Sequence, residues 1–172
     1  VEVAKLTADD AAASDAFGRS VAIAGDSVVV GADQDDSERG SVYIFHTSNG
    51  GASYNQVAKL TATDAVAGDE FGRSVAIAGD TVVVGAYAKN SGRGAAYVFR
   101  TTDGGATYVE VAKLTASDAA ASDNFGYSVA IAGATIVIGA RSDADAGSSS
   151  GSACVFQTSD GGATYGQVAK LT

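Results

Sequence analysis

One sequence unit occurs three times along this chain of 172 residues, and this repeat is the feature that most restricts its fold. The pentapeptide Val-Ala-Lys-Leu-Thr occupies residues 3–7, 57–61, 111–115 and 168–172, at spacings of 54, 54 and 57 residues. The decapeptide Phe17–Asp26 recurs unchanged at 71–80 and with two changes at 125–134. Internal repeats of roughly this length are typical of solenoids, propellers and other arrays of similar units.

The composition favours β-structure within each unit. Hydrophobic residues make up 46% of the chain, many of them Ala and Val, and there are 22 glycines but no Pro, Met or Trp. β-Branched runs separated by glycines are typical of strands joined by tight turns. We therefore expect an all-β protein.

The charge balance excludes nucleic acid as a partner. The formal net charge is −9 and the isoelectric point is about 4.3, so the surface repels a phosphate backbone, and no cluster of Lys and Arg offsets this.

The longest apolar stretch, 129–140, is interrupted by Gly133 and is too short to cross a bilayer, so we expect no membrane insertion. The single cysteine, Cys154, takes a tyrosine position of the other copies and is expected to be a buried strand residue.

Each unit contains the pattern of four antiparallel strands. In the first copy these are predicted at Ser20–Ala24, Ser27–Gly31, Ser41–Phe45 and Tyr54–Thr61. Gly25-Asp26 is a two-residue hairpin turn, and the polar segment Asp33–Gly40 is a longer loop. Four strands in a unit of this length match a propeller blade, whereas solenoid coils are usually shorter and carry one strand per face. The sequence predicts three β-propeller blades, in repeats at approximately 8–61, 62–115 and 116–172.

The repeated motif resembles the FG-GAP repeat, which is best known from the propeller heads of integrin α subunits and is common in secreted proteins. The resemblance covers all three copies and rests on the Phe-Gly pairs at 17–18, 71–72 and 125–126 and on the Gly-Ala pairs at 31–32, 85–86 and 139–140. Where the family expects Pro after Gly-Ala, this chain has Asp33, Tyr87 and Arg141. The resemblance implies a propeller fold and an extracellular or cell-surface location.

A second resemblance lies in the turn between the third and fourth strands. The segments 101–108 and 158–165 are similar to the Asp-box of sialidase-type propellers, with Tyr in place of the usual Trp. Asp103 and Asp160 are the expected structural residues of these turns, because a carboxylate can accept backbone N–H bonds there. Asn49 takes this position in the first copy.

Three blades do not complete a ring, since propellers usually have four to eight. Residues 1–7 match a fourth strand without the three before it, so the chain is expected to hold three blades and one surplus outer strand. Two alternatives remain open at this point: two chains form a ring of six blades, or the sequence is a segment of a longer array. The surplus strand favours the segment.

Acidic residues in two of the loops after Gly-Ala are candidate Ca²⁺ ligands. Asp33 and Asp35 in one loop, and Asp143 and Asp145 in the other, present alternating carboxylates of the kind that a Ca²⁺ loop uses. Neither loop completes the Asp-x-Asp-x-Asp-Gly pattern of integrins. The alternative is that these are solvated surface acids, and Ca²⁺ is the only cofactor that the sequence indicates.

Other acids recur in every crossover between blades, at Asp10 and Asp15, Asp64 and Asp69, and Asp118 and Asp123. Their recurrence predicts a structural task, such as an Asx-turn or backbone capping. Arg19 and Arg73 are expected to pair with these acids.

Catalysis has little support, because the only histidine, His46, corresponds to Arg100 and Gln157, and no nucleophile elbow is present.

The resulting hypothesis is a non-enzymatic extracellular propeller module for adhesion, recognition or surface assembly. Its variable loops, 33–40, 87–94 and 141–151, are expected to lie side by side and to carry any specificity for a protein or glycan at a cell surface. Two alternatives belong to other classes: a catalytic or accessory propeller domain of a carbohydrate-active enzyme, and a purely structural filament or sheath component. A homo-oligomer is compatible with each of these.

Overall fold

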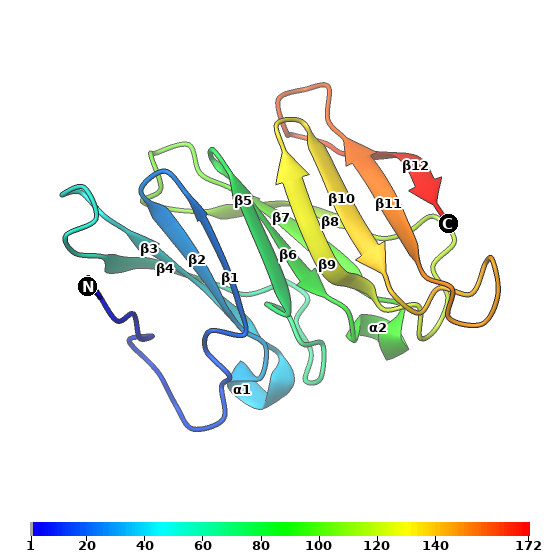
Figure 1. Ribbon diagram of the computed structural model, residues 1–172, viewed down its shortest axis with the longest axis horizontal. Coiled ribbons are helices and arrows are strands. Elements are labelled where there is room, and N and C mark those ends of the chain that lie inside the picture. The colour runs from blue at the N-terminus through cyan, green and yellow to red at the C-terminus, as the bar shows by residue number, and fades with distance from the viewer. Residues whose placement is uncertain (1) are drawn as a thin grey trace.

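Three antiparallel sheets of four strands each make up the computed structural model, which describes residues 2–172 (Figure 1). Blade 1 contains β1 (Ser20–Ala24), β2 (Ser27–Ala32), β3 (Ser41–His46) and β4 (Asn55–Leu60). Blade 2 contains β5 (Ser74–Ala78), β6 (Thr81–Ala86), β7 (Ala95–Arg100) and β8 (Val109–Leu114). Blade 3 contains β9 (Phe125–Ala132), β10 (Thr135–Ala140), β11 (Ser152–Gln157) and β12 (Gly166–Leu171). The predicted all-β class and blade architecture are confirmed, and the three sheets do not close into a ring.

The strands follow from short β-branched runs and from glycines at the turns. In blade 1, Ala24 pairs with Ser27 across the turn, and Gly25 has a φ of 54°, a positive value that the tight hairpin turns require and that glycine tolerates best. The third and fourth strands of each blade are joined by a longer hairpin, and a β-bulge interrupts their register in all three blades. The bulge increases the local twist of the outer strand.

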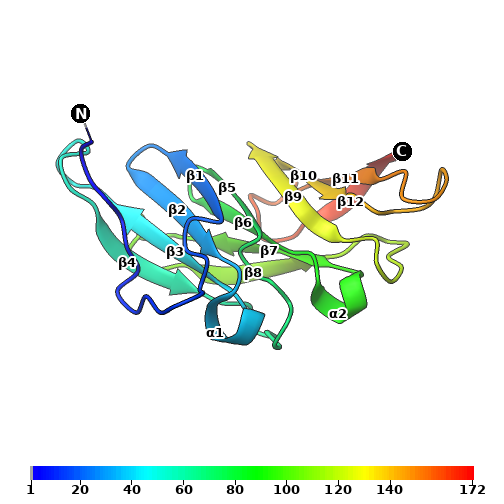
Figure 2. The same cartoon turned by 60° about the horizontal axis from the view of Figure 1, so that its bottom comes forward.

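The two segments labelled α1 (Asp35–Glu38) and α2 (Lys89–Gly92) are compact turns within the loops between the second and third strands. Residues inside both have positive φ, among them Asp36 at 48° and Asn90 at 53°. The polar loop predicted at 33–40 therefore winds tightly instead of extending. Its neighbours at 87–94 and 141–151 occupy the same edge of the molecule, as expected (Figures 1 and 2).

Each blade has two ends, which we name by their connections. The loop face carries the loops between the second and third strands, with α1, α2 and segment 141–151, together with the crossovers from one blade to the next (Figure 1). The hairpin face, at the opposite end, carries the turns between strands one and two and between strands three and four. Figure 2 shows α1 and α2 projecting together from the loop face.

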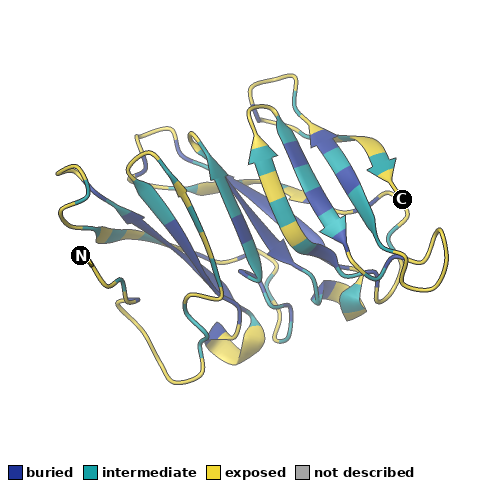
Figure 3. Ribbon diagram, in the orientation of Figure 1, coloured by how far each residue is buried: buried dark blue, intermediate teal, exposed yellow. Residues whose placement is uncertain are grey.

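The core lies between neighbouring blades and not inside one sheet. Between blades 1 and 2, Val29 and Ile44 of one sheet pack with Phe71, Val82 and Val84 of the next. Between blades 2 and 3, the corresponding cluster includes Val83, Val98, Phe125 and Ile138, together with the buried Cys154. Blade 2 thus packs one face against blade 1 and its other face against blade 3 (Figure 3).

The Phe-Gly pairs are the points at which one blade interlocks with the next. A Cβ atom at Gly40 would collide with the backbone of Phe71, and one at Gly94 would collide with the backbone of Phe125. A Cβ atom at Gly31 or Gly85 would likewise collide with the glycine carbonyl oxygen of the next Phe-Gly pair. Backbone approach this close explains why both halves of the motif contain glycine.

Residues 2–7 belong to no strand of the structure. Leu6 and Ala8 pack against blade 1, in a cluster with Val30, Tyr43 and Phe45. They take the positions that Leu60 and Ala62 hold against blade 2. The surplus outer strand stays a prediction, because a strand of another sheet would have to pair with it.

Candidate functional site

A lysine–aspartate cluster lies on the loop face of blade 1, and Asp35 is its buried member. Lys59 Nζ is 2.6 Å from Asp10 Oδ2 in the crossover and 2.8 Å from Asp35 Oδ2 in the loop that contains α1. Ser41 donates a further hydrogen bond of 2.5 Å to Asp35. Burial lowers the pKa of Lys59, but its hydrogen bonds with the two carboxylates outweigh this and raise the pKa above its ordinary value. The cluster joins β4, the crossover and the loop.

Blade 3 repeats this cluster with one more acid. Lys170 Nζ lies 2.6 Å from Asp118, 2.7 Å from Asp143 and 2.5 Å from Asp145. Ser152 donates to Asp143 at 2.7 Å, as Ser41 does to Asp35 in blade 1. The same arrangement therefore exists in both blades that have an acid at this loop position.

Blade 2 has the opposite charge at the corresponding loop position. Lys89, only 2% exposed, lies where Asp35 and Asp143 lie in the other blades, and it donates hydrogen bonds of 2.7 Å to Asp69 Oδ2 and to the Asp64 carbonyl oxygen. Lys113 donates to Asp64 at 2.6 Å, and so does the hydroxyl of Tyr97. Burial raises the pKa of Asp64, but these bonds outweigh it and lower the pKa to about 2.

The four predicted Ca²⁺ ligands do not act as one set in the structure. Asp143 and Asp145 face Lys170, Asp35 faces Lys59, and Asp33 lies apart from these clusters. Within residues 2–172, no three side chains among Asp, Glu, His and Cys converge as a metal site. Ca²⁺ binding stays a prediction, and the geometry gives these carboxylates a structural role in ion pairs.

The second acid of each crossover caps its own turn. Asp15, Asp69 and Asp123 each accept a hydrogen bond from the backbone N–H three residues earlier, at 2.7, 2.8 and 2.6 Å respectively. Such bonds fix the crossover just before the Phe-Gly pair. The expectation that Arg19 and Arg73 pair with the crossover acids is wrong, because both arginines face Asp33 instead.

Asp103 and Asp160 organise the long hairpins on the hairpin face. Asp103 accepts bonds from the Thr107 backbone N–H at 2.9 Å, from the Thr107 hydroxyl at 2.6 Å and from the Thr101 hydroxyl at 2.7 Å. Asp160 makes the same three bonds with Thr164 and Thr158. The bonds from Thr107 are the main reason that the pKa of Asp103 falls to about 2. These residues lie at the opposite end of the blades from the loop face.

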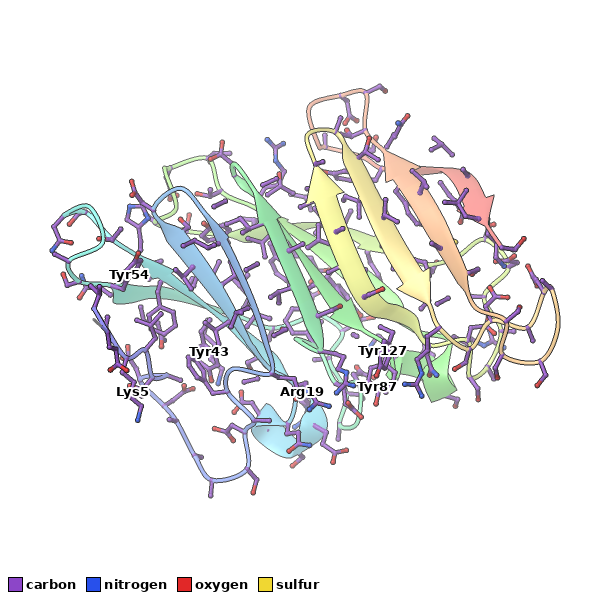
Figure 4. The ribbon with its side chains drawn as sticks, in the orientation of Figure 1. Lys5, Arg19, Tyr43, Tyr54, Tyr87 and Tyr127 are labelled. Carbon is purple, nitrogen blue, oxygen red and sulfur yellow. The ribbon has the colours of Figure 1, made fainter. Side chains whose placement is uncertain are left out.

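A continuous row of arginine and tyrosine side chains crosses all three blades on the loop face, and we call it the arginine–tyrosine row. It consists of Arg19, Asp33, Arg73, Tyr87, Tyr127 and Arg141. Every member follows either a Phe-Gly or a Gly-Ala pair, so each blade contributes the start of its first strand and the end of its second. Figure 4 shows Tyr87 and Tyr127 side by side, with Arg19 further toward α1.

Arg73 holds the middle of the row together. Its guanidinium carbon lies 5.5 Å from the ring centroid of Tyr87 and 4.9 Å from that of Tyr127, and Nη2 donates to the Tyr127 hydroxyl at 2.8 Å. Arg141 lies over Tyr127 at 4.5 Å and donates to the same hydroxyl at 3.0 Å. The hydrogen bond from Arg73 lowers the pKa of Tyr127 below its ordinary value. Cation–π contacts within about 6 Å are attractive, so the row is pre-ordered.

Two acids balance part of the charge of the row. Asp33 Oδ2 is 3.2 Å from Arg19 Nε and 3.6 Å from Arg73 Nη1, whereas its buried Oδ1 has no hydrogen-bond partner among the described residues. Glu70 accepts a bond of 2.8 Å from the Tyr87 hydroxyl. Burial is the main cause of the raised pKa values of both carboxyls. The side chain of Arg19 is 45% exposed, and Arg141 is exposed at the other end of the row.

Two shallow pockets flank the blade junctions. One, of about 160 Å³, lies beside α1 between Asp36, Lys59 and Ala65, and the other, of about 240 Å³, lies on the hairpin face beside Arg100 and Tyr165. Both are smaller than the roughly 300–1,000 Å³ of most small-molecule sites. The arginine–tyrosine row, which spans three blades, is therefore the stronger candidate for recognition. The sequence analysis did not predict this row. The varying residues that follow the Phe-Gly and Gly-Ala pairs were the pattern from which it could have been predicted.

Comparisons with known proteins agree with this architecture. The FG-GAP repeat family matches residues 1–45, 54–99 and 108–156. No curated protein is significantly similar in sequence. The crystal structure of Saccharomyces cerevisiae Sqt1 is similar with a TM-score of 0.58 and 13% sequence identity, over 91% of this chain and 35% of that one. The chain thus spans about a third of that protein, and the likeness concerns the fold alone. No helix among the described residues is long and apolar enough to cross a membrane.

Proposed function

Because the chain belongs to the FG-GAP repeat family, we propose that it is a non-enzymatic, extracellular recognition module that binds a carboxylate-bearing partner at a cell surface. The observation that carries the proposal is the arginine–tyrosine row. It is built from two repeat positions that vary: Arg, Arg and Tyr follow Phe-Gly in the three copies, and Asp, Tyr and Arg follow Gly-Ala. A fixed scaffold with variable, chemically active rim positions is typical of binding proteins.

The distribution of cations supports the choice of ligand. The chain has 11 Lys and Arg residues against 20 Asp and Glu. Four of its lysines are bound within the lysine–aspartate clusters and face their own carboxylates. Arg141, in contrast, exposes its guanidinium group over Tyr127 and has no carboxylate partner among the described residues. Arg19 faces Asp33, but 45% of its side chain remains exposed. Guanidinium groups bind carboxylates through paired, charge-assisted hydrogen bonds.

The geometry supports surface recognition over catalysis. His46 lies at the end of β3 on the hairpin face, where its ring nitrogen Nδ1 is 3.3 Å from the Ser27 hydroxyl. It is remote from the arginine–tyrosine row at the other end of the blades. Asp33 of the row is engaged by Arg19, and the neighbouring Glu70 by Tyr87, so the two carboxylates are not poised as a pair across a cleft. An extended rim suits a polymeric ligand or a partner's surface.

Binding of two carboxylated polymers tests the proposal, and the pair distinguishes a glycan source from a protein source. Polygalacturonate and poly-glutamate are immobilised, with neutral dextran as the blank, and binding is followed by surface plasmon resonance. We expect one acidic polymer to bind. Arg19→Gln and Arg141→Gln should each weaken that binding about tenfold or more, as the loss of a charge-assisted bond implies.

The matched control is Arg93→Gln, which removes one exposed arginine of the same loop face outside the row. We expect it to change affinity less than about twofold, as is usual for rim charges that make no specific contact. Equal weakening by Arg93→Gln would reduce the binding to net charge and overturn the site. Binding of neither polymer by the wild-type chain would overturn carboxylate recognition itself.

A further inference from the structure

The turn between β3 and β4 of blade 1 differs from its two counterparts at one side chain. Asn49 stands where the turns of blades 2 and 3 have Asp103 and Asp160, and each of the three is followed by two glycines. Asn49-Gly50 is the only Asn-Gly pair in the chain, and both of its residues are exposed to water. In such a pair the glycine nitrogen can attack the side-chain amide, because no Cβ hinders its approach. The amide of Asn49 is therefore a candidate for chemical conversion.

The turn holds the side chain of Asn49 by the same three contacts that hold the aspartates. Asn49 Oδ1 accepts hydrogen bonds of 2.9 Å from the Thr47 hydroxyl and 2.9 Å from the Ser53 backbone N–H. Asn49 Nδ2 donates to the Ser53 hydroxyl oxygen at 2.8 Å. In blade 2, Asp103 accepts bonds from the corresponding three groups. The turn of blade 1 thus already has the donor arrangement that binds a carboxylate in the other blades.

This arrangement also activates the amide. The two donors to Asn49 Oδ1 withdraw electron density from Cγ and stabilise the oxyanion that forms when a nucleophile adds there. Among the described residues, the N–H of Gly50 has no hydrogen-bond partner, whereas the N–H groups of residues 49, 51 and 53 are all bonded. Gly50 has a φ of 69°, and no atom lies within 4 Å of a Cβ built on it. The nucleophile is free and unhindered, and its place in the chain keeps it beside the amide.

We propose that Asn49 is a self-modification site, at which the folded hairpin converts the asparagine to aspartate with water as the only co-reactant. The Gly50 nitrogen forms a bond to Asn49 Cγ, the bond from Cγ to Nδ2 breaks, and a cyclic imide results. The proton lost by the Gly50 nitrogen is balanced by one that the leaving ammonia takes up through the Ser53 hydroxyl, which lies 2.8 Å from Nδ2. Water then adds at Cγ and breaks its bond to the Gly50 nitrogen, which recovers its proton. The net reaction exchanges an amide and water for a carboxylate and ammonium.

The fold selects aspartate over isoaspartate as the product. Water that adds to the other imide carbonyl would leave isoaspartate, which lengthens the backbone by one carbon. The turn depends on the backbone N–H groups of residues 49, 51 and 53, which all bond to Thr47 or to the Asn49 side chain. An extra backbone carbon changes their spacing. Aspartate keeps it, and the Ser53 hydroxyl can then donate a charge-assisted bond, as Thr107 does to Asp103 at 2.6 Å.

The conversion ends at aspartate. Asp103 and Asp160 are also followed by glycine, so the same ring closure would be open to them as acids. The hydrogen bonds from Thr107 lower the pKa of Asp103 to about 2, so that its carboxyl is ionised near neutral pH. An ionised carboxylate is a poor target for a nucleophile. The turns of blades 2 and 3 therefore show the stable end point of the reaction in blade 1.

Peptide mapping by mass spectrometry tests the proposal on the full chain, incubated in mildly alkaline buffer either folded or in urea. Trypsin releases the peptide 40–59, which contains Asn49 and, as an internal control, Asn55 followed by Gln56. We expect the mass change of an amide-to-acid exchange at Asn49 alone. The folded chain should react at least as fast as the chain in urea. Electron-transfer fragmentation should identify aspartate as the main product of the folded chain and isoaspartate as that of the chain in urea.

Matched serine variants test the part of the turn in the reaction. Ser53→Ala removes the hydroxyl beside Nδ2 but keeps the backbone donor, and it should slow the conversion about tenfold or more in the folded chain. In urea it should have no effect. Ser48→Ala is the control, because Ser48 is exposed and its hydroxyl forms no hydrogen bond among the described residues. It should react as the wild type does, and urea unfolding establishes that both variants fold.

The variant Asn49→Asp gives a second readout, which does not depend on rates. It should unfold at a higher urea concentration than freshly prepared wild type, because a carboxylate accepts the bonds of the turn more strongly than an amide. Incubated wild type should shift toward the same midpoint. Asn49→Gln closes the ring far more slowly and should keep its original midpoint.

Three results would overturn the proposal. The first is an intact Asn49 in the folded chain after a time that converts most of the chain in urea. The second is isoaspartate as the main product of the folded chain. The third is equal rates for Ser53→Ala and Ser48→Ala, which would remove the hydroxyl from the reaction. The turn lies on the hairpin face, so none of these results depends on carboxylate binding by the arginine–tyrosine row.

Discussion

Buried Lys89 of blade 2 should be replaceable by an aspartate if Ala95 is changed to serine at the same time. In blades 1 and 3, a serine accompanies the aspartate at this position. Blades 1 and 3 combine a loop aspartate with a serine on the third strand, Asp35 with Ser41 in blade 1, whereas blade 2 combines Lys89 with Ala95. Lys89→Asp with Ala95→Ser would therefore copy the arrangement of the neighbouring blades. In that arrangement, Lys113 takes the part that Lys59 plays in blade 1.

The size of the effect follows from the bonds that each change removes or adds. Lys89→Asp alone removes the partner of buried Asp69, a loss of about 3 kcal/mol or more for breaking a buried ion pair. Ala95→Ser alone buries a hydroxyl without a partner and costs about 1–3 kcal/mol. Together they form a hydrogen bond from serine to carboxylate, which is 2.5 Å long in blade 1. We expect a favourable coupling free energy of about 2 kcal/mol.

Urea unfolding of the wild type, both single variants and the double variant gives this coupling directly as a double-mutant cycle. A second cycle that pairs Ala95→Ser with Lys89→Ala is the control, because alanine offers the serine no carboxylate. That cycle should show a coupling within about 0.5 kcal/mol of zero. Equal couplings in the two cycles, or a double variant less stable than the sum of the single changes, would refute the reasoning.

Three further outcomes follow from the structure. Gly94→Ala should lower the free energy of unfolding by about 3 kcal/mol more than Gly104→Ala, because both residues have positive φ but only the first collides with the next blade; urea titration measures the difference. Asp103 has a folded pKa of about 2, below its unfolded value of roughly 3.8, so its stabilisation is complete above the unfolded value and is lost as the pH falls through about 2. NMR titration of its carboxyl should give that midpoint, and a value near 3.8 would contradict the turn geometry. Tyr127 should ionise below its ordinary pKa in an ultraviolet titration, and Arg73→Gln should raise its pKa; no change would mean that the hydrogen bond is not formed in solution.

The strands were predictable because each signal is local. The first hairpin was expected at Ser20–Ala24 and Ser27–Gly31, and the structure has Ser20–Ala24 and Ser27–Ala32. Alternating β-branched residues around a Gly-Asp turn determine such a hairpin without help from distant parts of the chain. The repeat then transfers the same assignment to the other two blades.

The ion pairs were not predictable from local pattern, because their partners lie far apart in sequence. Asp35 meets Lys59 only because β3 and β4 pair so that Tyr43 lies opposite Lys59. A loop with alternating aspartates looks the same whether it binds a metal or a lysine from another strand. The recurrence of this lysine in all three copies, always with a crossover acid, was the available sign of an internal partner.

The arginine–tyrosine row depends on contacts between blades, which a single repeat does not contain. Arg73 and Tyr127 occupy equivalent positions in neighbouring repeats, so aligning the copies places them in one column and not in contact. Stacking the blades brings the end of one second strand next to the start of the following first strand. The contacts Asp33 with Arg73 and Tyr87 with Tyr127 both arise in this way.

The most direct test of the central claim, recognition of carboxylates by the arginine–tyrosine row, is a two-dimensional NMR titration of the chain with trigalacturonate. The account predicts that the side-chain signals of Arg19, Arg73 and Arg141 shift together, with the neighbouring loop-face amides, while the signals of Asp103 and Asp160 stay in place. Shifts confined to the hairpin face, or no shift at millimolar ligand, would contradict it.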